Sequence, residues 1–124
     1  MGYSLGKRSL ENLEGVHPDL VAVVERAIEI TEQDFTVIEG LRSVERQREL
    51  LNAGKSTTMN SRHITGHAVD ICPWPVSWVW PEFYPIADAM KQAAEELDID
   101  LQWGGDWKSF PDAPHFQLSR KVYP

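Results

Sequence analysis

The chain has 124 residues, of which 42% are hydrophobic and 25% charged, a composition typical of one soluble globular domain. Its formal net charge of −7 argues against a nucleic-acid-binding protein, because such proteins use clusters of Lys and Arg to neutralise phosphates. Cys72 is the only cysteine, which excludes an internal disulfide and favours synthesis in a reducing compartment.

The first half of the chain predicts two helices separated by a strand. Pro18 and Asp19 are typical of a helix start, with proline in the first turn and an acid at the positive end of the helix dipole. Ser43 is a suitable N-cap for the second helix, and Gly54 follows its end. The expected elements are a helix over 18–31, a strand over 35–38, a helix from Ser43 to Leu51, and a polar loop over 55–62.

The second half predicts three strands and one helix. The β-branched Val69 and Ile71 alternate with other residue types before Pro73, as in a strand. An apolar stripe at helical spacing follows Pro81. Connections between elements are too short for several parallel crossovers, so we predict an α+β fold, a small antiparallel sheet with helices packed around it. The expected elements are strands over 68–72, 101–103 and 115–118 and a helix over 81–97.

No segment is suited to enter a membrane. Residues 1–10 lack the apolar run of a secretory signal, and residues 73–81 are too short and too rich in proline to span a bilayer. We therefore expect residues 1–124 to form a single domain that is made in the cytoplasm, is monomeric and does not insert stably into membranes. Residues 73–81, rich in tryptophan, fit either a lid over a cleft or a cover over the sheet.

Two separate segments carry the residue types of a catalytic zinc site. If a strand begins near His67, Asp70 lies on the face opposite the core residues, and His63 approaches from the preceding loop. His115 follows a loop in which two prolines exclude a helix. Two imidazoles and one carboxylate leave the fourth position of a tetrahedral zinc open to water, as catalytic zinc sites do.

Each segment taken alone favours a plainer interpretation. His63 and Asp70 fit a loop histidine and an aspartate paired with an arginine, and residues 112–114 fit a surface turn. In the functional interpretation Asp112 is a general base, which takes a proton from water and delivers it to the leaving amine.

The pattern Ser61-x-His63-x-x-Gly66-x-Ala68-x-Asp70, followed by Asp112-x-x-His115, resembles the zinc D-alanyl-D-alanine carboxypeptidase and L-alanyl-D-glutamate endopeptidase family. That family shares its fold with the amino-terminal signalling domain of hedgehog. Residues 4–18, 40–43 and 103–107 are also similar to the phage endolysin branch, so the resemblance covers nearly the whole chain. Many carboxypeptidase relatives have a glutamate at the base position, and Asp112 fits the endopeptidase branch better.

The resemblance implies that His63, Asp70 and His115 bind zinc and that Asp112 is the base. It also places Arg42 near the scissile carbonyl, where a guanidinium would stabilise an oxyanion. The alternative is a solvated charge beside Glu39 or Glu45. The implied activity is cleavage between L-alanine and D-glutamate in the peptide stem of bacterial peptidoglycan. The family context implies a phage lytic enzyme that reaches the cell wall after a partner protein permeabilises the membrane.

Four further residues are candidate substrate contacts. Ser61 fits a polar contact or a loop hydrogen bond, and His67 fits a cleft position or a structural hydrogen bond. Trp103 and Trp107 flank two glycines that permit unusual backbone angles, and this segment is predicted to form a cleft wall. Trp103 fits the core equally.

Two other functions are compatible with these residues. A D-alanyl-D-alanine carboxypeptidase on the same fold needs a positive group for the terminal carboxylate of its substrate, and only Arg42 is a candidate. A non-catalytic zinc-binding interaction domain is the second alternative, and the presence of Asp112 argues against it.

Overall fold

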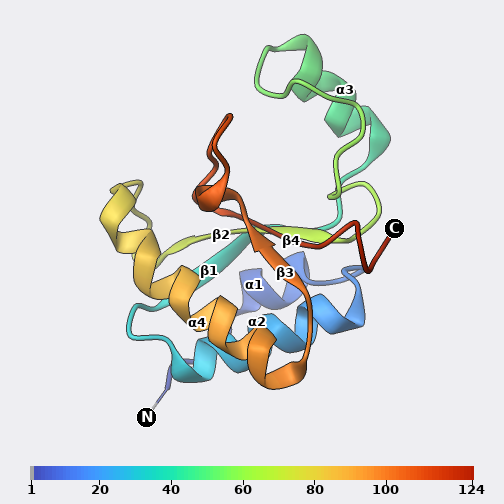
Figure 1. The fold of residues 1–124 in the computed structure, drawn as a ribbon. Coiled ribbons are helices and arrows are strands. Elements are labelled where there is room, and N and C mark those ends of the chain that lie inside the picture. Colours follow the sequence, from blue (N-terminus) through green and yellow to red (C-terminus); the bar gives the residue numbers. More distant parts are fainter. Residues whose placement is uncertain (1) are drawn as a thin grey trace.

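The computed structural model describes residues 2–124, and its centre is a four-stranded antiparallel sheet in the order β1-β2-β4-β3 (Figure 1). The predicted α+β class is confirmed. The strands are β1 (Phe35–Glu39), β2 (Ala68–Pro73), β3 (Leu101–Trp103) and β4 (His115–Leu118). The α-helices are α1 (Lys7–Asn12), α2 (Pro18–Ile30), α3 (Val44–Asn52) and α4 (Phe83–Leu97), and 3-10 turns cover Trp80–Glu82 and Gly104–Asp106. None of the described helices has the length and apolar character needed to cross a membrane.

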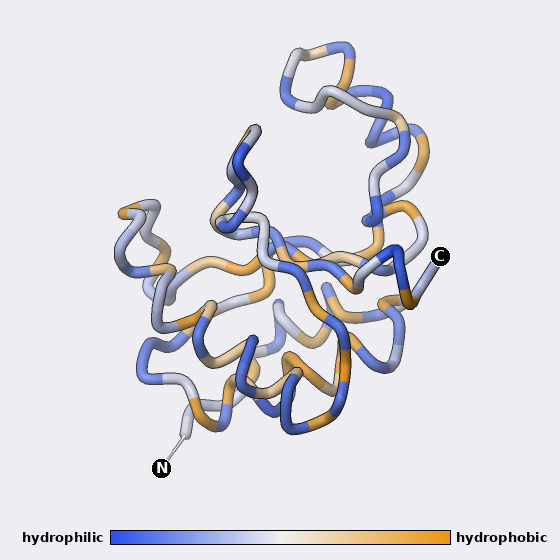
Figure 2. Tube along the Cα trace, viewed as in Figure 1, coloured by the Kyte–Doolittle hydropathy of each residue, from blue (hydrophilic) through white to orange (hydrophobic). Residues whose placement is uncertain are grey.

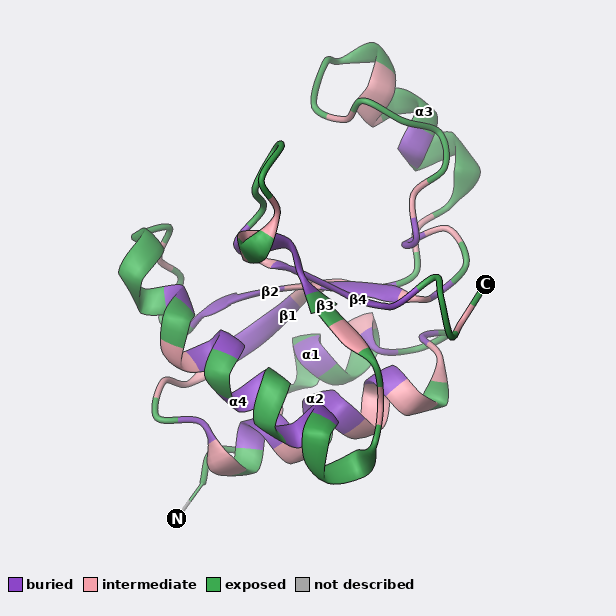
Figure 3. Cartoon of the chain, in the orientation of Figure 1, coloured by how far each residue is buried: buried purple, intermediate pink, exposed green. Residues whose placement is uncertain are grey.

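The hydrophobic core lies between one face of the sheet and the helices α2 and α4 (Figures 1 and 2). Val69 and Ile71 on β2 and Phe116 on β4 are fully buried on this face. Apolar residues of α2 and α4 recur every three or four positions and turn toward them, so that each helix has a buried and an exposed side (Figure 3). Burial of each large apolar side chain contributes about 1.5–3 kcal/mol.

The helix starts follow from local capping. The His17 ring accepts a hydrogen bond from the Asp19 N–H at 3.1 Å, with Pro18 in the first turn of α2. The Ser43 Oγ accepts from the Arg46 N–H at 3.0 Å and caps α3 as predicted.

Helix α1 closes the free edge of β1 and was not expected from the sequence. The Ser9 Oγ accepts from the Val37 N–H at 2.9 Å, and the Asn12 amide donates to the Val37 carbonyl at 2.8 Å. These side chains satisfy backbone groups that an edge strand leaves unpaired. The helix has six residues and buries only Ser9, so it carries no apolar periodicity to reveal it.

Helix α3 lies apart from the helix layer. Together with the loop after it, α3 projects from the opposite side of the sheet, and we call residues 43–60 the arm (Figure 1). Within the arm only Gln47 is buried. The sheet face below the arm is therefore left open by α2 and α4.

Candidate metal centre

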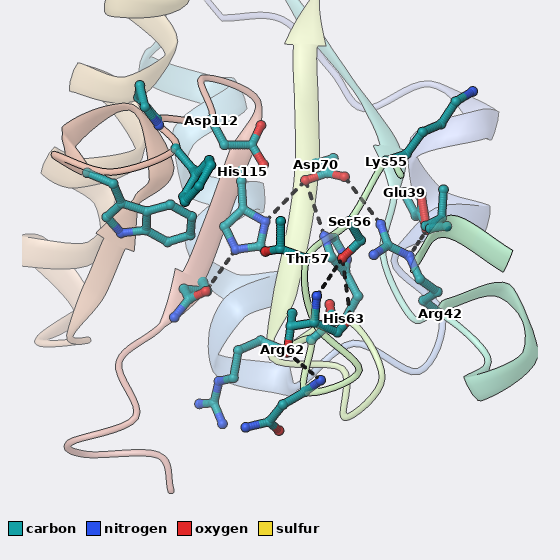
Figure 4. Close-up of a pocket in the computed structure, with 18 of the residues that line it drawn as sticks. Glu39, Arg42, Lys55, Ser56, Thr57, Arg62, His63, Asp70, Asp112 and His115 are labelled. Atoms are coloured by element: carbon teal, nitrogen blue, oxygen red, sulfur yellow. Dashed lines mark hydrogen bonds and ion pairs between the residues drawn. The ribbon is translucent and has the colours of Figure 1, made fainter. Parts of the chain in front are cut away.

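His63, Asp70 and His115 meet on this open face of the sheet. Each offers a ligand atom, and these three atoms lie within 4.8 Å of one another. The Asp70 Oδ1 is 3.2 Å from the His63 Nε2 and 3.3 Å from the His115 Nδ1 (Figure 4). Strand register accounts for the meeting, because Asp70 on β2 pairs directly with His115 on β4, and His63 belongs to the turn before β2. Gly66 makes that turn with a positive φ of 75°.

A hydrogen bond on the outer nitrogen fixes the orientation of each imidazole. The His63 Nδ1 lies 2.8 Å from the Gly40 carbonyl oxygen, and the His115 Nε2 lies 2.8 Å from the Gln117 Oε1. An acceptor at that position keeps the proton on the outer nitrogen and leaves the inner nitrogen free to bind a metal. Two such imidazoles and one carboxylate are donors that suit Zn²⁺, so the residues present fit a zinc ion.

The charges of the three residues are strongly coupled. Burial alone would raise the pKa of Asp70, but hydrogen bonds and charge from His115 and His63 outweigh it and hold that pKa well below its ordinary value. Burial alone would lower the pKa of His115, but the hydrogen bond and charge of Asp70 raise it above its ordinary value. The site therefore favours a positive charge between the two rings and Asp70, which a proton or a divalent cation can supply.

Asp112 lies beside the three residues, on the loop that precedes β4 (Figure 4). Its carboxyl is exposed, and partial desolvation followed by the negative charge of Asp70 raises its pKa. A raised pKa makes a carboxylate a better proton acceptor near neutral pH, which suits a general base.

The position of Asp112 depends on Gly104. The Asp112 N–H donates to the Gly104 carbonyl at 2.9 Å, and a Cβ on residue 104 would lie 2.4 Å from the Asp112 carbonyl oxygen and 3.1 Å from the His115 Cβ. Gly104 is therefore needed for the space that its missing side chain leaves. The sequence suggested an unusual backbone angle here, but the φ of Gly104 is not positive.

We expect Gly104→Ala to displace the segment that carries Asp112 and His115. The overpacking should destabilise the fold by about 1–3 kcal/mol, and a shift of about 1 Å at the site should lower kcat roughly 100-fold. Thermal unfolding and turnover measure the two effects. Gly6→Ala is the matched control, because a Cβ there meets nothing within 4 Å; equal turnover in both variants would contradict the steric argument.

The three residues form the floor of a groove of about 750 Å³. The arm lines one wall, and the loop 107–112 lines the other (Figures 1 and 4). Ser61 and Trp107 line the groove as predicted, and the Trp107 ring centroid is 5.2 Å from that of His115. The Ser61 Oγ also accepts a hydrogen bond from the His63 N–H at 3.2 Å, so this residue stabilises the loop as well.

Arg42 reaches the centre from the arm side of the groove. Its Nη2 is 3.7 Å from the Asp70 Oδ2, and its Nε donates to Glu39. The side chain is about 10% exposed, so Arg42 is held next to the three residues and is not a freely solvated charge.

Two predicted substrate contacts lie elsewhere. His67 is not among the described residues that line the groove; its Nδ1 is 2.7 Å from the Thr65 Oγ1, and its ring packs against His17. Trp103 is in the core, where it stacks on Phe116 and donates from Nε1 to a backbone carbonyl. Both predictions are corrected, because these side chains leave the backbone on the side facing away from the groove.

The segment 73–81 is not a lid over the groove. Its residues do not line the groove, and Trp78 is 62% exposed. Glu39 is the acidic neighbour of Arg42, as one of the two sequence alternatives has it. The contacts of Gln47 with Arg42 and of Gln117 with His115 were not predicted.

Comparisons with known proteins identify the family of this chain. The family model described as phage L-alanyl-D-glutamate peptidase matches residues 1–123. The L-alanyl-D-glutamate peptidase of Escherichia phage T5 is 35% identical over 130 residues, which cover 99% of this chain and 94% of that protein. The crystal structure of the L-Ala D-Glu endopeptidase ChiX of Serratia marcescens is 52% identical with a TM-score of 0.91, covering 95% of this chain and 91% of that one. The vancomycin-resistance D,D-dipeptidase VanXYg, 19% identical with a TM-score of 0.55 over 83% of this chain and 50% of that one, shares the fold alone.

Proposed function

This chain belongs to the family of phage L-alanyl-D-glutamate peptidases, and we propose from that membership and the groove that it works as a zinc enzyme. Its activity is hydrolysis of the bond between L-alanine and D-glutamate in the peptide stem of peptidoglycan. The zinc ion is held by His63, Asp70 and His115. The observation that carries the proposal is that both imidazoles turn a nitrogen toward Asp70 while an acceptor fixes the other nitrogen.

The surrounding residues then have defined roles. When bound, zinc supplies a Lewis acid that polarises the scissile carbonyl and makes water acidic enough to react near neutral pH. Asp112 accepts the proton of the attacking water and delivers it to the departing amine of D-glutamate. Arg42 donates hydrogen bonds to the carbonyl oxygen as negative charge develops on it.

The charge of the groove supports a stem peptide as the substrate. Four basic side chains and three carboxylates line the groove, whereas the net charge of the chain is −7. The basic ones are Arg42, Lys55, Arg62 and Arg120, and the carboxylates are Glu39, Asp70 and Asp112. A D-glutamate residue carries a carboxylate that the scissile bond does not use. The nearly balanced charge of the groove admits such a substrate, whereas the acidic surface elsewhere repels it.

Digestion of purified peptidoglycan, followed by mass spectrometry of the fragments, tests the activity. We expect fragments with a new amino-terminal D-glutamate. Release of single D-alanine from the stem terminus would instead identify a carboxypeptidase, and binding without any fragment would identify a non-catalytic domain.

Removal of the metal tests the zinc proposal. We expect a chelator to abolish hydrolysis and added Zn²⁺ to restore it. Because zinc binds the folded chain, zinc at 100 times its Kd should raise the unfolding free energy by about 2.7 kcal/mol, which thermal unfolding measures. The proposal would be overturned if a sample that metal analysis shows to be free of zinc kept its full activity.

We also propose that the enzyme acts as a monomer at the cell wall, after a separate protein has permeabilised the membrane of the host. Support comes from the phage family and from the location of the substrate outside the membrane. Light scattering tests the oligomeric state. Expression of the protein inside bacterial cells tests the need for a partner. We expect the cells to lyse when their membrane is permeabilised and to stay whole when it is intact.

A further inference from the structure

Gln47 is the one buried residue of the arm, on a helix whose other residues are exposed or half-buried. A buried amide is costly unless its donors and acceptor are used. The Gln47 Oε1 accepts from the Arg42 Nη1 at 2.7 Å. Its Nε2 donates to the Ser56 Oγ at 2.8 Å and to the Thr58 carbonyl at 2.6 Å. All the hydrogens of the amide are therefore engaged.

These bonds connect two different parts of the groove. Arg42 lies beside Asp70 at the metal centre, whereas Ser56 and Thr58 belong to the wall that the arm contributes. Gln47 touches both and is fully buried between them. A single side chain therefore makes the direction of the Arg42 guanidinium depend on the position of the arm.

We propose that Gln47 is a positioning residue, which aims Arg42 at the developing oxyanion and couples that aim to the substrate-facing wall of the arm. A guanidinium stabilises a transition state only when its donors point to where the charge forms. Glu39 and Asp70 attract Arg42 by charge, and Gln47 supplies the directional contact on the remaining side. The inference rests on the proposed role of Arg42.

Gln47→Met tests the inference, because methionine keeps the volume and removes all three hydrogen bonds. We expect kcat of the zinc-loaded enzyme to fall about tenfold and KM to rise as the wall of the arm loses its contact, with the zinc content unchanged. Gln47→Glu restores an acceptor for Arg42 but no donor for the arm, so kcat should recover while KM stays raised. A merely structural residue would lower the melting temperature in both variants without this split between kcat and KM.

A double-mutant cycle with Arg42→Ala separates the inference from the role of Arg42. If Gln47 acts through Arg42, adding Gln47→Met to Arg42→Ala should leave kcat unchanged. Multiplicative effects of the two substitutions would overturn the inference, as would an unchanged kcat in Gln47→Met alone. An Arg42→Ala enzyme with full kcat would instead overturn the oxyanion role itself.

Gln33→Leu is the matched control. The Gln33 amide also donates to two backbone carbonyls, of Asp34 and Trp74, but it does not line the groove. We expect this variant to lose some stability and to keep both kcat and KM. A tenfold loss of kcat in Gln33→Leu would show that any lost glutamine contact slows the enzyme, and would remove the support for Gln47.

Discussion

Replacement of Asp112 by alanine should lower kcat by about 10²–10⁴-fold, the range that a positioned general base contributes. Asp112 lines the groove but is not one of the three residues that can hold the metal, so the zinc content should be unchanged. Its side chain is exposed, so its loss should change the stability little. Turnover of a stem peptide, together with zinc content and thermal unfolding of the same sample, measures all three expectations.

The nearby Asp106→Ala is the control for Asp112→Ala. Asp106 pairs with Lys91 at 2.7 Å and does not line the groove, so kcat should be unchanged. An Asp112→Ala enzyme with its zinc and full turnover would shift the role of base to Glu39, the other carboxylate that lines the groove beside Asp70.

The raised pKa of Asp112 also predicts the acid side of the pH–rate profile. A base works only when ionised, so turnover of the wild type should fall as the pH drops through the pKa of Asp112. Because desolvation and the charge of Asp70 raise this pKa, the fall should begin above the pH at which an ordinary aspartate is protonated. In Asp112→Ala the residual turnover should no longer fall with decreasing pH in this range.

Much of the centre follows from short-range rules that a sequence displays. Alternation along β2 places Asp70 opposite Val69 and Ile71 once those two are assigned to the core. The prolines beside Asp112 exclude a helix, and Gly66 permits the turn after His63. These constraints are local, so the position of each residue on its own segment was predictable.

Side-chain contacts between distant segments were harder to predict. Trp103 and Trp107 are four residues apart with two glycines between them, and only packing against Phe116 decides which one is buried. Gln47 shares a helix face with Val44 and Leu51, but neither of these apolar residues is buried. Polar contacts with the arm and Arg42 bury Gln47 instead, and apolar spacing does not reveal such contacts. The contact of Gln117 with His115 could have been predicted, because Gln117 lies two residues after His115 on the same strand and therefore shares its face.

Asp70→Asn should abolish both zinc binding and hydrolysis. Asp70 is the only carboxylate of the three candidate ligands, and it is approached by His63, His115 and Arg42. An amide of the same shape cannot balance the charge of a divalent ion beside a guanidinium. Zinc content by elemental analysis and turnover of a stem peptide should both fall to background. Glu39→Gln, which changes another groove carboxylate outside the three, should keep its zinc.

The metal-free forms give a second, independent test of Asp70. The pKa of His115 is raised in the folded chain, so its pairing with Asp70 adds stability below about pH 6.5 and loses it as the pH rises through the raised value. The pKa of Asp70 is lowered, so its contribution is present above about pH 4 and is lost in stronger acid. The metal-free wild type should therefore exceed metal-free Asp70→Asn in stability most clearly between these two values.

We expect a difference on the order of 1–3 kcal/mol in that range, as for hydrogen bonds between charged groups, and a smaller one at pH 9 or at pH 2. Urea unfolding of both metal-free proteins across this range measures it. The same difference at pH 6 and pH 9 would mean that Asp70 stabilises the chain by packing or neutral hydrogen bonds. A pH-dependent difference would instead show that the fold holds two imidazoles around a carboxylate whose charge is available to a cation.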